Sequence, residues 1–395
     1  MTTANQIPDL TPTAAVVATD LLVMIAPSQP EQFEQLLTRL ADSFPAETTL
    51  IVSPDVPAPE FETLFRMEST ATTKASWTLT ASDFVAAYQA GLKHGASRIL
   101  MLGPESASLT STALRDLGNC VMGSSIDLAI PHYDLPPRAG LVNSAILYPL
   151  TRALFAQPAR FPLAIDLGLS MRMAERLATA SQRFTALNQG DALIWPIDEA
   201  AVAGFNITEL EVGTRALPQP SESDFNSVLA LVAGSLFSDI DAKAAYWQRA
   251  RTLPPMRNLI AQPWSTEPAD IAPMLDAFRL AYINLREIWS LVLPPNSLLG
   301  LKRLSTIDAS TFRMPDSLWA RIVYDFLLAY RMRTINRGHL LGALIPLYLA
   351  WVASHINITA SGTDSERHIE EVAAAFQADK PYLVSRWRWP DRFNP

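Results

Sequence analysis

The stretch RILMLGPES, residues 98–106, joins a short apolar run to an abrupt stop. Ile99 to Leu102 are four successive apolar residues, which is typical of a strand buried on both faces, and Gly103-Pro104 ends the run. Open α/β sheets bind ligands beside the ends of such strands. Glu105 is therefore either a ligand above a pocket or the first solvated residue of a turn.

Strands and helices alternate on both sides of this stretch. Apolar runs predict strands at residues 20–26, 48–55 and 126–134, and apolar residues at helical spacing predict helices at 30–44, 82–96 and 108–124. Strands separated by helices favour a mainly parallel sheet that is covered by helices on both faces. The first half of the chain is therefore predicted to have an α/β fold.

The pattern changes after about residue 222. Long segments with helical periodicity follow, and proline pairs at 254–255 and 294–295 separate them. We expect a flexible leader at residues 1–15, an α/β domain at 16–222 and an all-helical C-terminal domain at 223–395. The final segment YLVSRWRWPDRFNP, residues 382–395, indicates an arm that packs by its aromatic residues or contacts a ligand or partner.

Composition excludes several classes of protein. The 395-residue chain has a formal net charge of −8, so no broad basic surface for nucleic acid is expected. Its single cysteine, Cys120, excludes an internal disulfide and fits a reducing compartment. The apolar run at 340–354 is shorter than a bilayer span and contains Pro346, so we expect a buried helix there. With no signal-peptide pattern, the expectation is a cytoplasmic protein without a transmembrane segment.

An ordered set of residues stands out between residues 132 and 198. It consists of Tyr133, Gly140, Asn143, Tyr148-Pro149-Leu150, Arg152, Pro162, Asp166 to Ser170 and Trp195 to Asp198. In order and spacing this set resembles the nucleotide-sugar glycosyltransferases of family 2, and the related group of mannosylglycerate synthase and glucosyl-phosphoglycerate synthase. In layout, the resemblance covers about residues 18–220.

The resemblance implies a GT-A fold, which is a Rossmann-like sheet that binds a sugar nucleotide at its strand ends. It also implies transfer of a sugar from a nucleoside-diphosphate donor to a small polar or phosphorylated acceptor. In the family, an Asp-x-Asp motif after the strand that corresponds to residues 98–103 holds a divalent cation, Mg²⁺ or Mn²⁺, against the diphosphate. Gly103-Pro104-Glu105 stands in that place here, so Glu105 is the remaining candidate metal ligand.

The resemblance also implies which residues bind the donor. Asp55 is expected near the nucleoside and Glu105 beside the diphosphate, although Ser-Pro-Asp at 53–55 is an equally good turn. Arg152 and Arg215 are candidates for phosphate charge, because arginine pairs well with phosphate oxygens. Arg215 would then replace the charge of a metal ion.

On the acceptor side, the resemblance implies roles for two acids. Asp166 is expected near the acceptor and the sugar hydroxyls, and Asp198 is expected to orient the acceptor or to act as a base for its hydroxyl. Capping of the following helix is the other interpretation of each acid. His132 ends the predicted strand at 126–134, where packing is favoured over catalysis.

The missing metal-binding acid also supports a second interpretation. In it, the chain is a non-catalytic GT-A-fold module that binds a nucleotide sugar or serves assembly. The remaining histidines, among them His355 and His368, show no ligand-like spacing, and GxSxG, HExxH and CxxC motifs do not occur. The sequence leaves the stereochemistry of transfer and the oligomeric state open, including a homo-oligomer.

Overall fold

The computed structural model describes residues 19–389, apart from 28, 56, 60, 62, 71–76, 124, 219–224 and 255–268. The predicted leader at 1–15 and the end of the predicted arm, 390–395, lie outside the described residues.

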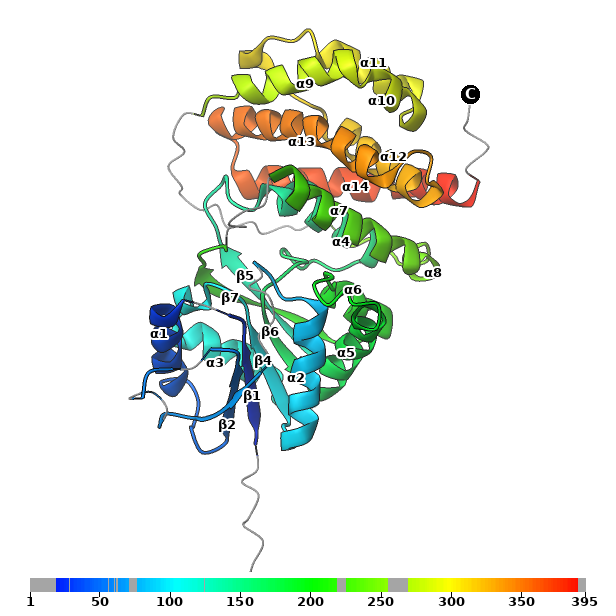
Figure 1. Cartoon of the computed structure of the whole chain (residues 1–395). Helices are drawn as coiled ribbons and strands as arrows, with labels where there is room; N and C mark the ends of the chain where they lie inside the picture. The colour runs from blue at the N-terminus through cyan, green and yellow to red at the C-terminus, as the bar shows by residue number, and fades with distance from the viewer. Residues whose placement is uncertain are drawn as a thin grey trace, which may run out of the picture.

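Seven strands form one sheet in the described part of the chain (Figure 1). They are β1 (Leu21–Ile25), β2 (Thr49–Ser53), β3 (Arg66–Ser69), β4 (Arg98–Leu102), β5 (Leu128–Asp134), β6 (Asp166–Ser170) and β7 (Ile207–Thr214). The order is β3-β2-β1-β4-β6-β5-β7. All pairs are parallel except those of β6, which runs antiparallel to both β4 and β5. The expected mainly parallel sheet is thus confirmed, and β3, β6 and β7 are strands that the apolar runs did not predict.

Helices cover both faces of the sheet, as expected. They are α1 (Pro30–Ala41), α2 (Ala81–His94), α3 (Ser111–Cys120), α5 (Met171–Thr185) and α6 (Pro196–Ala203). In β1, Leu22 and Met24 pack toward α2 and α5, whereas Leu21 and Val23 pack toward α1 and α3. This alternation follows from the two-residue period of a strand, and it buries all five residues of β1.

A helical layer lies beyond the carboxyl ends of the parallel strands (Figure 1). Its helices are α4 (Tyr148–Phe155), α7 (Phe225–Ala242), α8 (Ala244–Trp247), α9 (Ala272–Asn284), α10 (Arg286–Val292), α11 (Pro295–Leu304), α12 (Asp316–Met332), α13 (Arg337–Ala360) and α14 (Ser365–Arg388). Three short turns complete the described elements: 3₁₀ turns at Ser106–Ser108 and Ala309–Thr311, and a π-helical turn at Asn143–Leu147.

Helix α4 and the π-helical turn before it belong to the core of the helical layer, although they precede residue 222. Leu154 and Phe155 pack in the same apolar cluster as Phe237 and Trp319. The Nε1 of Trp319 also donates a hydrogen bond of 2.8 Å to the carbonyl of Ala145. The helical C-terminal part is confirmed, and the domain boundary at 222/223 stays a prediction.

Two long helices contain an internal proline. Helix α13 includes Pro346 and α14 includes Pro381, so the predicted arm from residue 382 continues α14 as far as Arg388. Trp387 is buried and packs edge-to-face on Trp247, with 5.0 Å between ring centroids. By length and composition, α7 and α13 are apolar enough to cross a membrane, yet 67% of the apolar window of α13 is buried within the protein.

Candidate functional site

A buried ion pair closes the carboxyl end of β4. Asp166 is the first residue of β6, Arg215 follows β7, and both side chains are 0% exposed. The Nε of Arg215 lies 2.9 Å from Oδ2 of Asp166, and its Nη2 lies 3.2 Å from Oδ1. This two-point pairing is the strong geometry for arginine and a carboxylate. The structure thus joins two predicted site residues that are 49 positions apart.

Tyr133 completes what we call the strand-end cluster of Tyr133, Asp166 and Arg215. Its hydroxyl donates a 2.9 Å hydrogen bond to Asp166, whose other oxygen accepts a 3.2 Å bond from the N–H of Gly103. Burial and the Asp166 carboxylate raise the pKa of Tyr133, so the hydroxyl stays protonated. Burial lowers the pKa of Arg215, but the Asp166 carboxylate outweighs it and the net shift is upward. Asp166 therefore begins a strand and fixes the loop after β4, and it does not cap a helix.

Glu105 lies next to the strand-end cluster. Its φ of 63° is uncommon for a residue other than glycine, and its Oε2 accepts a 2.8 Å hydrogen bond from Nε2 of Gln32. Among the described residues, no three or more His, Cys, Asp or Glu side chains are grouped so that they would hold a metal ion. Glu105 alone does not form a cation site, because Mg²⁺ and Mn²⁺ need several oxygen ligands.

Asp55 lies just beyond β2, on the same edge of the sheet as Glu105. It is partly exposed, and its backbone N–H donates a 3.1 Å hydrogen bond to Oγ of Ser53. The local structure therefore contains the turn that the sequence offered as an alternative. The role of the Asp55 carboxyl group near the nucleoside stays a prediction.

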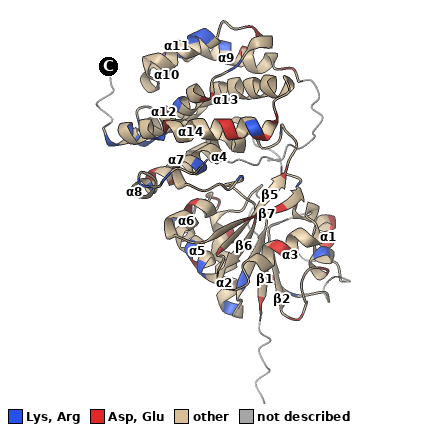
Figure 2. Cartoon of the chain, turned by 180° about the vertical axis from the view of Figure 1, so that it is seen from behind, with Lys and Arg blue, Asp and Glu red and all other residues tan. Residues whose placement is uncertain are grey.

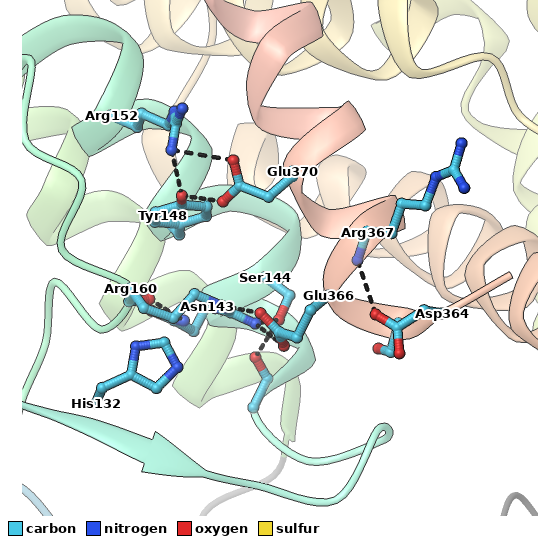
Figure 3. Close-up of polar contacts among 12 residues, drawn as sticks. His132, Asn143, Ser144, Tyr148, Arg152, Arg160, Asp364, Glu366, Arg367 and Glu370 are labelled. Carbon is cyan, nitrogen blue, oxygen red and sulfur yellow. Dashed lines mark hydrogen bonds and ion pairs between the residues drawn. The ribbon is translucent and has the colours of Figure 1, made fainter. Parts of the chain in front are cut away.

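Arg152 lies between α4 and α14 and not at a strand end (Figure 3). It is 1% exposed, and its Nη1 lies 3.0 Å from Oε2 of Glu370 and 2.7 Å from the hydroxyl of Tyr148. The Tyr148 hydroxyl also hydrogen-bonds to Glu370. Burial, followed by the Glu370 carboxylate, raises the pKa of Tyr148. The three side chains join α4 to the first turns of α14.

Asp198 belongs to a separate buried cluster. It lies in the first turn of α6, is 0% exposed, and its carboxyl group interacts with that of Asp239. Burial and the nearby Asp239 carboxylate raise its pKa well above the ordinary value, which favours the protonated form of Asp198. Lys243 pairs with Asp239 and with Glu199, at 2.9 Å from the latter. This cluster joins α6 to α7.

A pocket of about 840 Å³ opens between the carboxyl ends of β5 and β7 and the junction of α13 with α14. His132 and Tyr133 of β5, and Ser144 and Tyr148 after it, form one wall. Acidic and basic residues stand next to each other along α14, which forms the opposite wall (Figure 2). The acidic residues that line the pocket are Asp134, Glu209, Glu211, Asp364, Glu366 and Glu370.

Arg160 and His132 are the basic residues on the lining (Figure 3). Arg160 binds both oxygens of Glu366, at 2.9 and 3.0 Å, and its Nη2 donates to Oγ of Ser144 at 3.0 Å. Nδ1 of His132 lies 3.5 Å from Glu209. Burial lowers the pKa of His132, but the hydrogen bond and charge of Glu209 outweigh it and raise that pKa overall. The pocket thus keeps an excess of negative charge.

Arg160, Glu366 and Glu370 were not predicted as site residues from the sequence. Arg160 lies within the segment that carries the resemblance, so its position was a usable signal. Glu366 and Glu370 stand one turn apart on a predicted helix, but Glu366 meets Arg160 across 206 residues of chain. No local pattern reports such a contact.

Comparison with known proteins finds similar solved structures, but no similar family and no similar curated sequence. No protein-family model matches the chain, and no curated protein matches its sequence. One similar structure is glucosyl-3-phosphoglycerate synthase from Mycobacterium tuberculosis in complex with phosphoglyceric acid, at 13% identity and a TM-score of 0.36, over 57% of this chain and 79% of that one. The same enzyme with Mn²⁺, uridine diphosphate and glucosyl-3-phosphoglycerate matches at 14% and 0.35, over 60% and 86%.

Proposed function

We propose that the chain is a cytoplasmic glycosyltransferase with a GT-A fold, which moves a sugar from a nucleoside-diphosphate donor to a small acceptor. One observation supports this most. Residues within the segment that resembles such transferases, His132, Tyr133, Ser144 and Tyr148, line a pocket at the carboxyl edge of the sheet. That edge is where open α/β folds bind nucleotides and their partners.

In this proposal the donor lies along the ends of β2 and β4, with Asp55 near the nucleoside and Glu105 beside the diphosphate. Asp166 and Arg215 act as positioning residues, because they hold the loop that carries Glu105 and are themselves buried. Arg152 positions α14 beside the pocket in the same way. A divalent cation, where the reaction uses one, would take Glu105 from the protein and its other ligands from the diphosphate.

The acceptor occupies the pocket, and its charge is the feature that the lining selects. Glu366 and Glu370 are paired with arginines, whereas Glu211 is largely exposed and Asp134 and Asp364 add further negative charge. Like charges inside one cavity repel an anion. Of the two acceptor classes expected from the sequence, we therefore favour a polar, hydroxyl-rich acceptor over a phosphorylated one.

A transfer assay tests the proposal. Nucleoside-diphosphate sugars are supplied singly with pooled sugars, polyols and phosphorylated acids, with and without Mn²⁺, and release of the nucleoside diphosphate is followed. We expect release of the nucleoside diphosphate with one donor. We expect this release to be faster with a neutral acceptor than with the phosphorylated form of the same acceptor. Glu105→Ala should remove any dependence on Mn²⁺, whereas Glu31→Ala, an exposed acid on α1, should not.

A non-catalytic module is the second candidate, and a specific observation favours it: Asp166 and Arg215 are engaged with each other, and Asp198 is enclosed. Donor binding without turnover in the assay would support a module that binds nucleotide sugars. If the chain shows no donor binding and no turnover, the proposed donor site is contradicted. An assembly role would then be the remaining function of the module.

A further inference from the structure

Two buried histidines, His355 of α13 and His368 of α14, contact each other beside the pocket. Their Nδ1 atoms are 2.7 Å apart. The two residues, His355 and His368, are 1% and 2% exposed. Trp351 stacks on both rings, at 5.3 and 6.1 Å between centroids. A contact of this length between two ring nitrogens requires one proton between them, so one ring donates and the other accepts.

The pair belongs to a longer chain of hydrogen bonds. Nε2 of His355 lies 3.2 Å from Oγ of Ser365, and Nε2 of His368 lies 3.2 Å from Oδ1 of Asp316. Ser365 is the first residue of α14, and its side chain lines the pocket. Asp316 is the first residue of α12 and is partly exposed. Four polar groups from three helices therefore connect the pocket with a partly exposed carboxylate at the start of α12.

Counting protons gives this chain a direction. With both rings neutral and Asp316 ionised, every contact is satisfied in one way: Ser365 donates to His355, Nδ1–H of His355 donates to His368, and Nε2–H of His368 donates to Asp316. In this arrangement Nε2 of His355 carries no proton and accepts the hydrogen bond of the Ser365 hydroxyl. The alternative is a proton on Nε2 of His355; His368 then carries Nδ1–H, and its contact with Asp316 needs a further proton on Nε2 of His368 or on Asp316.

We infer that Ser365, His355, His368 and Asp316 form a proton relay that takes the proton from a hydroxyl group bound in the pocket. This inference rests on the proposed function, in which an acceptor hydroxyl gains a glycosyl group and loses its proton. The hydroxyl proton passes to Oγ of Ser365, the Ser365 proton passes to Nε2 of His355, and Nδ1–H of His355 passes to Nδ1 of His368. The imidazolium formed on His368 is paired with the Asp316 carboxylate.

The surroundings of His355 place the transferred charge on His368. Burial, followed by the adjacent His368, lowers the pKa of His355 to about 3, so a charge does not stay on that ring. The Pro137 carbonyl and Glu366 favour the protonated ring, and Arg160 opposes it. His368 has the Asp316 carboxylate 3.2 Å from its outer nitrogen, so a proton that reaches this ring lies beside a carboxylate.

Histidine NMR tests the relay without any substrate. The chain has five histidines, so long-range ¹⁵N–¹H spectra can resolve each ring, and His339→Gln on the exposed side of α13 removes one signal as a control for assignment. At pH 7 we expect two neutral rings, with the proton on Nδ1 in His355 and on Nε2 in His368. A charged His368 with the proton of His355 on Nε2 would leave no vacant site and would overturn the relay.

Kinetics test its use in transfer. Ser365→Ala and Asp316→Asn should lower kcat about 10- to 100-fold with little change in KM, and should shift the acid limb of the pH profile. Ser361→Ala, an exposed serine in the adjacent turn, should not. Unchanged kcat in Ser365→Ala would overturn the relay while leaving the transferase intact. A chain that turns over no donor, yet shows the expected tautomers, would instead contradict the proposed function.

Discussion

Asp166 neutralises a guanidinium group that water does not reach. Because breaking a buried pair leaves one charge uncompensated, Asp166→Asn should lower the free energy of unfolding by about 3–5 kcal/mol. Urea denaturation at pH 7 measures this loss. The matched control is Glu371→Gln, which breaks the exposed pair with Arg367 and should cost less than about 0.5 kcal/mol. Equal losses in the two variants would show that the Asp166–Arg215 pair is not the closure of the strand end.

The sequence predicted which single residues matter better than it predicted what each of them does. The resemblance selected Asp166, Arg152 and Asp198, and the structure places all three in buried polar clusters. Their partners Arg215, Glu370 and Asp239 come from distant parts of the chain, and the sequence does not show such pairing. His355 and His368, 13 residues apart on two helices, had no ligand-like spacing, yet the turn between the helices brings their rings into contact.

At the scale of elements, Gly168 controls how closely α3 approaches β6. A Cβ at Gly168 would lie 2.2 Å from the carbonyl oxygen of Leu117, a backbone atom that cannot rotate aside. Gly168→Ala should therefore destabilise the protein by about 1–3 kcal/mol, as overpacking does. Gly342→Ala is the control, because nothing lies within 4 Å of that Cβ in α13, and alanine should stabilise the helix there. Thermal unfolding of both variants checks the opposite signs.

The contact between α13 and α14 should make stability depend on pH. The folded pKa of His355, about 3, lies below its unfolded value of roughly 6.5. The contribution of neutral His355 to the free energy of unfolding is therefore fully present above pH 6.5, and it is lost as the pH falls toward 3. Between pH 6.5 and 5 this loss should reach about 2 kcal/mol. Urea denaturation across that range should show the loss in the wild type and in His339→Gln.

His355→Gln is the variant that isolates this effect, because it has no ring to titrate. The difference in unfolding free energy between wild type and His355→Gln should shrink as the pH falls. Parallel curves for the two proteins would contradict a neutral His355 held between the helices.

The elements themselves were predicted where local pattern decides them. The apolar run at 98–102 gave β4, and helical spacing gave α1 and α2 within a few residues of their ends. β6 was missed because its strand starts at a polar residue, Asp166, and its antiparallel direction depends on pairing with β4 and β5. The internal prolines of α13 and α14 did not end those helices, because surrounding packing outweighs a local propensity.

Over the whole molecule, the helical layer covers the edge of the sheet where the strands point (Figure 1). The alternation of strands and helices in the first half of the sequence predicted the sheet with its covering helices. The long segments with helical periodicity in the second half predicted the helical layer. The sequence did not predict that α4 joins the helical core, or that α14 supplies one wall of the pocket. Such contacts between distant segments create the site, which explains why the fold was easier to predict than the pocket.

The central claim is that this chain binds a nucleoside-diphosphate sugar at the carboxyl edge of its sheet. Thermal unfolding with a panel of nucleoside diphosphates and their sugars, with and without Mn²⁺, tests it most directly, since a ligand that binds the folded state raises its stability. We expect one sugar nucleotide to raise the midpoint with a saturable dependence on concentration, and Asp55→Ala to weaken that effect. No increase with any member of the panel at millimolar concentration would contradict the claim.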